Sequence, residues 1–140
     1  MVGLVVASHG RLAEEFLGAA RQILGEFPRT ATCNVPPAAS LEELRTQLQL
    51  AIKSVDDGDG VLLFADLIGG SPCTQGLSLC RQSNLEVITG VNLPMLLKAN
   101  SLRAVQPSAS LEVMAHDLAQ YGQKNITCAT DLLRAKASAA

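Results

Sequence analysis

Residues 4–24 read LVVASHGRLAEEFLGAARQIL and contain the two patterns that decide the fold. Leu4–Ala7 is an unbroken aliphatic run, which is typical of a β-strand covered on both faces. Beyond it the apolar residues recur at helical spacing on one stripe, formed by Leu12, Phe16, Ala20 and Ile23, with Ala13, Leu17 and Leu24 beside it. Gly25 then favours the end of this helix. A buried strand that leads directly into an amphipathic helix is typical of a parallel sheet.

The same alternation of strand and helix continues along the chain. We expect further strands at residues 30–35, 61–65 and 85–89, of which 61–65 is the most apolar. Ser40 and Glu43 have the spacing of a capping box, in which each side chain satisfies a backbone amide at the start of a helix. The predicted helix carries an apolar stripe at helical spacing, made of Leu41, Leu44, Leu48, Ile52 and Val55.

Three more helices are predicted from their first residues. Ser71-Pro72 is expected to begin one of them, with the serine as N-cap and the proline at the first helical position. Pro94 is expected to begin the next. Ser110 caps a last helix that runs to Tyr121, and Gly122 is expected to end it.

The predicted fold is a single α/β domain, with an open, mostly parallel four-stranded sheet and helices on both faces. No linker, repeat or low-complexity block divides the chain, so we expect the domain to span residues 1–135 and residues 136–140 to form a flexible tail. Residues 126–130 are a candidate for a short fifth strand. A strand order of 2-1-3-4, as in flavodoxin-like sheets, would place the first and third strands side by side.

The composition narrows the class of function. Of the 140 residues, 48% are apolar and 3% aromatic, and the net charge is −2 with 11 Lys and Arg residues scattered along the chain. A nucleic-acid partner is therefore not expected, since neither a basic face nor a stacking surface is indicated. No segment reaches the roughly 20 apolar residues that span a bilayer. The four cysteines form no CxxC pair. We expect a cytoplasmic protein with free thiols.

Two polar side chains follow neighbouring strands of this predicted sheet. His9 comes two residues after the first strand, and Asp66 directly follows the third. Ligands of open α/β sheets bind at the carboxyl ends of the strands, near the point where the strand order reverses, so the order 2-1-3-4 would bring the two side chains together. A carboxylate bound to Nδ1–H fixes the imidazole tautomer and leaves the Nε2 lone pair to attack phosphorus. The pair predicts a nucleophilic histidine.

The segment Gly69-Gly70-Ser71-Pro72 follows Asp66 and opens a helix. The amides and positive dipole end of a helix N-terminus bind anions, glycine lets the backbone come close, and the Ser71 hydroxyl adds a donor. Gly69, Gly70 and Ser71 are therefore expected to bind a phosphoryl group.

Each of these features also has a simpler interpretation. His9 could cap a strand end, and Asp66 could bind only loop amides. The Gly-Gly-Ser-Pro segment, taken alone, is more typical of a tight turn and helix cap. Asn92 is expected to be a structural residue, in a left-handed or turn conformation that holds its loop. A metal site is not predicted, because the other histidine, His116, has no third ligand at suitable spacing.

Three motifs in order resemble one known family. Residues 5–13 (VVASHGRLA) are similar to the active-site start of the mannose-type IIA components of the bacterial phosphoenolpyruvate-dependent sugar phosphotransferase system (PTS). Residues 66–72 (DLIGGSP) and 90–97 (GVNLPMLL) resemble the second and third motifs of that family. The resemblance covers about residues 2–122.

The resemblance implies a role for each matching position. His9 would accept a phosphoryl group from phospho-HPr and donate it to a IIB component, and Asp66 would orient it. Ser71 and its neighbouring backbone would contact the phosphoryl group, and the loop from Gly90 to Pro94, which includes Asn92, would form the rim of the site. The family fold is a four-stranded parallel sheet in a homodimer with an exchangeable C-terminal strand, for which residues 126–130 are the candidate.

Two positions depart from the family pattern and concern its partners. The chain has Ile68 where family members often carry a large aromatic residue, and Cys73 where they carry a bulky one. These side chains are expected to touch the docking partner, although the simpler interpretation of Cys73 is a small apolar residue that packs in the core. No IIB domain is fused within the sequence, so a IIB partner is expected as a separate chain, and membrane association only through the transporter.

Three functions are consistent with these residues. The leading one is a histidine phosphocarrier for sugar uptake, which needs no metal or organic cofactor. The second is a regulatory module whose phosphorylation at His9 reports PTS flux to a target protein. The third is the related phosphotransferase subunit of dihydroxyacetone kinases, which shares the histidine start but is less similar in the other two motifs.

Overall fold

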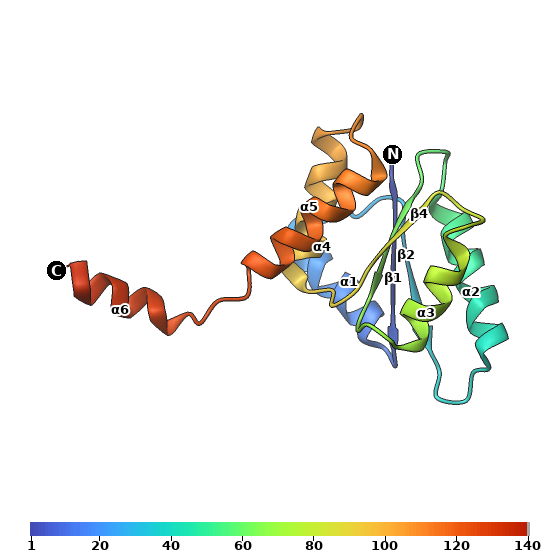
Figure 1. The fold of residues 1–140 in the computed structure, drawn as a ribbon, viewed down its shortest axis with the longest axis horizontal. Coiled ribbons are helices and arrows are strands. Elements are labelled where there is room, and N and C mark those ends of the chain that lie inside the picture. Colours follow the sequence, from blue (N-terminus) through green and yellow to red (C-terminus); the bar gives the residue numbers. More distant parts are fainter. Residues whose placement is uncertain (140) are drawn as a thin grey trace.

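Four parallel strands form one sheet in the order β2-β1-β3-β4 in the computed structural model, which describes residues 1–139 (Figure 1). The strands are β1 (Gly3–His9), β2 (Thr30–Val35), β3 (Val61–Ala65) and β4 (Leu85–Ile88). The central strands β1 and β3 pair with Ala7 opposite Ala65. Both are buried along their length up to Ser8 and Ala65, which is why they read as continuous aliphatic runs. The predicted α/β fold and strand order are confirmed.

Helices cover both faces of the sheet, as Figure 1 shows. On one face lie α1 (Leu12–Leu24), α4 (Leu93–Val105) and α5 (Leu111–Lys124). On the other lie α2 (Leu41–Val55) and α3 (Ser71–Leu79). Successive residues of a strand point to opposite faces. In β1 this places Leu4 and Val6 in the core beneath α1, α4 and α5, while Val5 and Ala7 pack beneath α2 and α3.

The buried stripe of α1 differs from the predicted one at its edge. Ala13, Leu17 and Ala20 are buried, whereas Leu12, Ile23 and Leu24 are exposed. The three buried residues follow helical spacing among themselves, so the periodicity is present but the stripe is rotated by one position. In α2, the capping box of Ser40 and Glu43 forms as expected, and Leu41 is the one predicted stripe residue that remains exposed.

Two glycines act differently from the prediction. Gly70, and not Ser71, is the N-cap of α3, with an extended backbone, so Ser71 is the first helical residue. Gly122 does not end α5, which continues to Lys124. A β-carbon at Gly122 would lie 2.5 Å from Cε of Met95 in α4, so the Met95 side chain packs directly against the glycine backbone and would have to move to admit a side chain there.

The C-terminal segment also differs from the prediction. The short fifth strand expected at residues 126–130 is not formed: residues 126–128 have no regular structure, and α6 (Thr130–Ala139) begins at Thr130. Figure 1 shows α6 standing away from the rest of the chain. Residues 136–139 of the expected tail belong to this helix, and Ala140 lies outside the described residues. No helix within residues 1–139 is long and apolar enough to cross a membrane.

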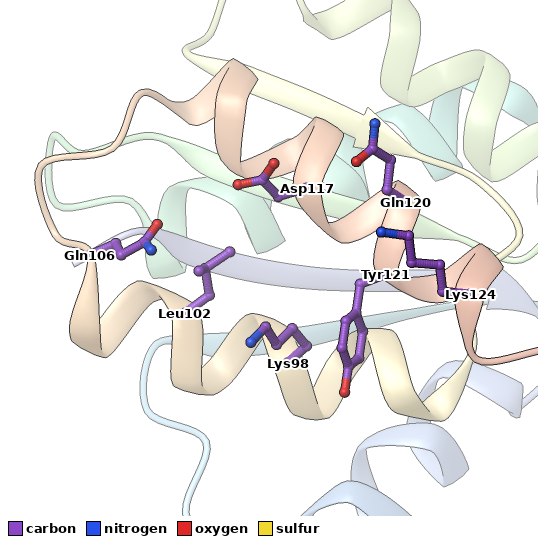
Figure 2. Close-up of a pocket in the computed structure, with 7 residues that line it drawn as sticks. All are labelled: Lys98, Leu102, Gln106, Asp117, Gln120, Tyr121 and Lys124. Carbon is purple, nitrogen blue, oxygen red and sulfur yellow. The ribbon is translucent and has the colours of Figure 1, made fainter.

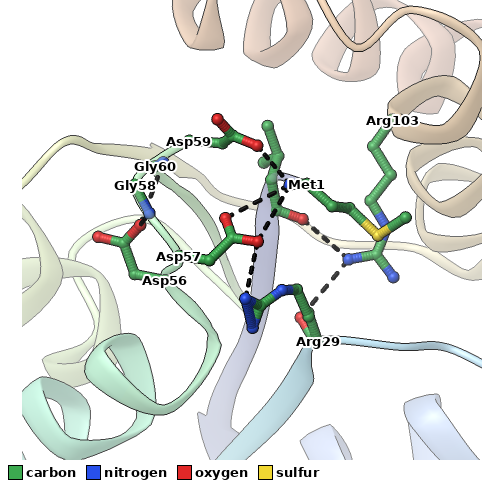
Figure 3. A network of polar contacts seen from close by, with 9 residues as sticks. Met1, Arg29, Asp56, Asp57, Gly58, Asp59, Gly60 and Arg103 are labelled. Carbon is green, nitrogen blue, oxygen red and sulfur yellow. Dashed lines mark hydrogen bonds and ion pairs between the residues drawn. The ribbon is translucent and has the colours of Figure 1, made fainter.

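A polar network ties together the amino ends of the strands (Figure 3). The buried guanidinium of Arg103 in α4 donates to the carbonyl of Val2 at 2.9 Å and to the carbonyls of Pro28 and Arg29. Burial lowers the pKa of Arg103 to about 10. Asp57 pairs with Arg29 at 2.7 Å and with the amino group of Met1. This network holds the amino ends of the strands together, at the opposite end of the sheet from His9 and Asp66.

Candidate functional site

His9 and Asp66 meet at the carboxyl end of the sheet, as predicted. His9 is the last residue of β1 and so lies within the strand rather than two residues beyond it. The neighbouring strand β3 ends at Ala65, opposite Ala7, so His9 extends past the last pairing between the two strands. The side chain of Asp66 takes the place of a strand carbonyl there: its Oδ2 accepts the backbone amide of His9 at 2.9 Å.

The same carboxylate oxygen also binds the imidazole ring. Nδ1 of His9 lies 2.7 Å from Oδ2 of Asp66, and the side chains are 52% and 8% exposed. An ionised carboxylate only accepts hydrogen bonds, so Nδ1 carries the proton in this pair. Nε2 is then the nitrogen with a free lone pair, on a ring that is half open to solvent.

The environment of Asp66 keeps its carboxyl group ionised. Burial opposes ionisation and is the largest single influence on its pKa. The hydrogen bonds from the amide and ring of His9, the electrostatic interaction with that ring and the amide of Leu67 at 3.0 Å act in the opposite direction and together outweigh burial. The pKa of Asp66 is therefore lowered, and the group is a carboxylate at neutral pH.

The loop from β3 to α3 packs against the imidazole. A β-carbon on Gly70 would lie 2.9 Å from Cε1 of His9, closer than real side-chain contacts allow. Gly69 has a φ of +78°, the left-handed region that favours glycine. These two glycines bring the first turn of α3, which begins at Ser71, to the ring of His9. The first amides of a helix have no acceptor within the helix, so this turn is suited to an anion.

Asn92 and Pro94, expected at the rim, belong to the start of α4. The amide of Val91 donates to the carbonyl of Ala65 at 3.2 Å, which places this loop beside the end of β3. Asn92 is the N-cap of α4: its Oδ1 accepts the amide of Met95 at 3.0 Å, and its Nδ2 donates to the carbonyl of Gly122 at 3.0 Å. Its φ of −131° is extended, so the left-handed or turn conformation expected for it is wrong, while its structural role as a helix cap is confirmed.

The two departures from the family pattern differ in accessibility. Ile68 is 79% exposed, in the loop that follows Asp66, and can meet a partner. Cys73 is only 2% exposed, within the first turn of α3. The expectation that Cys73 touches a docking partner is therefore wrong, because its side chain is turned into the core. Leu12, three residues after His9, and Leu67, which follows Asp66, are exposed as Ile68 is.

Sequence reasoning passed over Ser8, which precedes His9. Its side chain is fully buried, and its Oγ accepts the amide of Ala13 at 2.6 Å. The hydroxyl donates to the carbonyl of His9 at 3.1 Å. The available signal was a polar residue at the end of the aliphatic run, on the face of the strand that alternation assigns to Leu4 and Val6.

Elsewhere the described residues offer no comparable chemistry. No group of three or more His, Cys, Asp or Glu side chains within residues 1–139 could hold a metal ion. His116 is exposed on α5, with Nε2 4.0 Å from a carboxylate oxygen of Glu112. Figure 2 shows a groove between α4 and α5, where Lys98 lies over the ring of Tyr121, with 5.3 Å between Nζ and the ring centroid. Neither His9 nor the β3–α3 loop lines this groove.

Comparison with known proteins places the site in a family. Residues 3–116 match the sequence model of the family EIIA-man, described as "PTS system fructose IIA component". The chain belongs to this family of mannose-type PTS IIA components. The matched range contains the three motifs around His9, Asp66 and Asn92, so the resemblance seen in the sequence is confirmed.

Several curated relatives support the family. Over 108 residues the chain is 32% identical to the mannose-specific EIIAB component of Escherichia coli (strain K12). This matched segment covers 76% of this chain and 33% of that protein. The chain thus spans about a third of the length of that relative. It is 25% identical over 104 residues to the fructose-specific EIIA component of Bacillus subtilis (strain 168), covering 74% of this chain and 71% of that protein. It is 28% identical over 128 residues to the transcriptional regulatory protein LevR of Bacillus subtilis (strain 168), covering 89% of this chain and 13% of LevR.

A solved structure agrees with the family. The mannose/sorbose-specific IIA subunit from Enterococcus faecalis superposes with a TM-score of 0.79 at 31% identity, over 90% of this chain and 92% of that chain. A PTS EIIA component from Streptococcus agalactiae superposes with a TM-score of 0.84 at 21% identity, over 94% and 99% of the two chains, and this likeness concerns the fold alone.

Proposed function

We propose that this PTS IIA family member is a histidine phosphocarrier, which accepts a phosphoryl group on His9 from phospho-HPr and passes it to a IIB component during sugar uptake. The observation that carries the proposal is the 2.7 Å contact between Nδ1 of His9 and Oδ2 of Asp66, on a ring that is half exposed. The reaction takes place in the cytoplasm, and the chain reaches the membrane only through its transporter.

Phosphoryl transfer needs little from the protein beyond alignment and charge stabilisation. The lone pair of Nε2 attacks the phosphorus of the donor while the bond from phosphorus to the donor nitrogen breaks, and the electron pair of that bond returns to the donor nitrogen. The His9 ring gains positive character as the new bond forms. The carboxylate of Asp66, 2.7 Å from Nδ1, stabilises this charge and keeps the proton on Nδ1.

Gly69, Gly70 and Ser71 are proposed to bind the phosphoryl group. The closeness of Gly70 to Cε1 of His9 supports this role, since Cε1 lies between Nδ1, which Asp66 already binds, and the free Nε2. The start of α3 at Ser71 supplies backbone amides and the positive end of the helix dipole. The hydroxyl of Ser71 is a further donor. Asn92 and Pro94 act indirectly, by holding the start of α4 beside the end of β3.

We further propose that the chain works as a homodimer. Three large apolar side chains of the C-terminal segment are exposed in the single chain: Ile126, Leu132 and Leu133. A second copy would cover them, in keeping with the cost of leaving apolar surface in water. Sedimentation equilibrium tests this proposal. A chain that stays monomeric at all concentrations up to 1 mM, where the association free energy would be weaker than about 4 kcal/mol, contradicts it.

A second candidate function is a regulatory module, in which phosphorylation at His9 is read by a target protein. The observation that favours it is the match over 89% of this chain to LevR, whose name describes a transcriptional regulatory protein. The exposed Ile68 beside the site could select such a target. Affinity capture with His9→Ala as bait separates the two functions: recovery of a transporter IIB protein supports transport, and recovery of a transcriptional regulator supports regulation.

The experiment that tests phosphoryl acceptance uses labelled phosphoenolpyruvate, enzyme I and HPr. We expect label on the wild type and none on His9→Ala. His116→Ala is the matched control, because it removes an exposed histidine of α5 that the proposal does not use, and it should be labelled like the wild type. Label on His9→Ala, or loss of label from His116→Ala alone, contradicts the assignment.

A further inference from the structure

We propose that Ser8 is a positioning residue for His9, whose buried hydroxyl fixes the backbone from which the imidazole is aimed; this inference rests on the proposed function of His9. The side chain of Ser8 is 0% exposed. Its hydroxyl accepts the amide of Ala13 at 2.6 Å and donates to the carbonyl of His9 at 3.1 Å. A buried hydroxyl is retained at little cost only where such partners satisfy it.

Strand geometry explains how Ser8 acts without touching the reacting ring. Alternate residues of β1 point to opposite faces, so Ser8 lies with Leu4 and Val6 on the side of α1, and His9 lies with Val5 and Ala7 on the side of α3. The contacts agree: Ser8 meets Ala13 of α1, and His9 meets Gly70 at the start of α3. Ser8 therefore acts on His9 from the opposite face of the sheet, through the backbone of β1.

Three polar groups of His9 are thereby fixed by two side chains. Asp66 accepts from the amide and from Nδ1, and Ser8 donates to the carbonyl. With both backbone groups of His9 held, the residue has little freedom to rotate about its φ and ψ angles. The ring is therefore held against Asp66 in one orientation. The hydrogen bond at Nδ1 alone would not fix that orientation.

Ser8 also links His9 to the start of α1. The N-cap of α1 is Arg11, whose side chain makes no capping hydrogen bond. The hydroxyl of Ser8 supplies the acceptor for the amide of Ala13 in the first turn instead. The turn between β1 and α1, with Gly10 at a φ of +55°, is thus closed by the residue that also holds His9.

Loss of the hydroxyl should therefore loosen the ring. In Ser8→Ala the Nδ1–Asp66 bond forms in a smaller fraction of molecules, so the lone pair of Nε2 is less often available in line with the donor. Since small misplacements of a reacting group can cost up to 10²-fold in rate, we expect the phosphorylation rate at saturating phospho-HPr to fall by about tenfold, with half-saturation nearly unchanged.

The test compares Ser8→Ala with Ser8→Thr, which keeps the hydroxyl, and with Ser110→Ala, which removes a helix cap of α5 remote from the site. Nitrogen NMR of the His9 ring in the unphosphorylated protein is measured beside the transfer rate. We expect Ser8→Ala to weaken the Nδ1–H signature and to lower the rate by about tenfold. Ser8→Thr should keep both to within about threefold of the wild type, and Ser110→Ala should leave both unchanged.

Wild-type ring tautomer and rate in Ser8→Ala would overturn the inference, and so would equal losses in Ser8→Ala and Ser110→Ala. If Ser8→Ala does not fold, Ser8→Cys replaces the hydroxyl by a weak donor of similar size. Its Nδ1–H signature and transfer rate are then compared with those of the wild type, and wild-type values of both would overturn the inference. Absence of label from the wild type would overturn the proposed function instead. The NMR signature would still decide whether Ser8 controls the ring.

Discussion

One oxygen of Asp66, Oδ2, accepts hydrogen bonds from both the amide and the ring of His9, at 2.9 and 2.7 Å. The amide bond fixes where His9 leaves β1, and the ring bond fixes which nitrogen keeps the proton. Because Asp66 directly follows β3, this double contact requires β1 and β3 to be neighbours with Ala7 opposite Ala65. The strand order of the fold thus sets up the geometry on which the proposed chemistry depends.

Replacing Asp66 by alanine should slow phosphorylation of His9. The ring loses the acceptor at Nδ1 and no longer stays in one tautomer, so we expect a fall on the order of 10- to 100-fold in the rate of label transfer from phospho-HPr. Asp117→Ala on α5 removes a carboxylate from outside the site and should leave the rate unchanged. An unaltered rate in Asp66→Ala would remove this residue from its proposed role.

The lowered pKa of Asp66 predicts an acid-sensitive contribution to stability. A carboxyl group whose pKa is lower in the folded than in the unfolded state stabilises the fold above its unfolded pKa, near 3.8, and loses that contribution as the pH falls through the folded pKa. We expect the free energy of unfolding by urea to differ between wild type and Asp66→Asn by a constant amount near neutral pH. This difference should become smaller below about pH 4. A gap that widens on acidification would contradict the assigned direction.

Gly70→Ala tests whether the β3–α3 loop positions the ring. The new β-carbon would lie 2.9 Å from Cε1 of His9, so the ring or the loop must shift, and we expect the transfer rate to fall by roughly tenfold or more. Gly18→Ala is the matched control, since a β-carbon at this exposed position of α1 meets nothing within 4 Å. It should keep the rate and raise stability by about 0.5–1 kcal/mol. Equal rates in the two variants would exclude a positioning role for Gly70.

Arg103 should matter for stability and not for transfer. In Arg103→Met the carbonyls of Val2 and Pro28 lose a buried donor, so we expect a loss of about 2–4 kcal/mol in the free energy of unfolding, measured by chemical denaturation. Arg81→Met, at an exposed position, should change it by less than about 0.5 kcal/mol. Similar losses in the two variants would mean that the buried network contributes little.

Local patterns predicted most of the fold because each one has a local physical cause. The strands at residues 30–35 and 61–65 have the expected bounds, and the capping box of Ser40 and Glu43 is present. The meeting of His9 with Asp66 was predicted on the assumption of the flavodoxin-like strand order 2-1-3-4, which the structure confirms. These inferences needed only hydrophobic periodicity, capping and the rule that ligands gather at the carboxyl ends of parallel strands.

The errors arose where a distant contact decides the structure. Gly122 has the local character of a helix stop, but it lies buried inside α5, where its backbone packs against the Met95 side chain of α4. Cys73 follows a polar turn, but its side chain lies on the buried face of α3 and packs into the core. The β-branched segment at residues 126–130 pairs with no strand within the single chain and leads into α6, while its exchange between subunits stays a prediction. Such contacts are not encoded in the spacing of nearby residues.

In the proposed mechanism, Asp66 holds the proton on Nδ1 of His9 and leaves Nε2 to carry the phosphoryl group. Nitrogen–phosphorus correlation NMR of the protein phosphorylated from labelled phosphoenolpyruvate identifies the bonded nitrogen directly. We predict a single phosphorylated histidine, His9, with phosphorus on Nε2 and the proton on Nδ1. Phosphorus on Nδ1 of His9, or on any residue other than His9, would rule out the proposed mechanism.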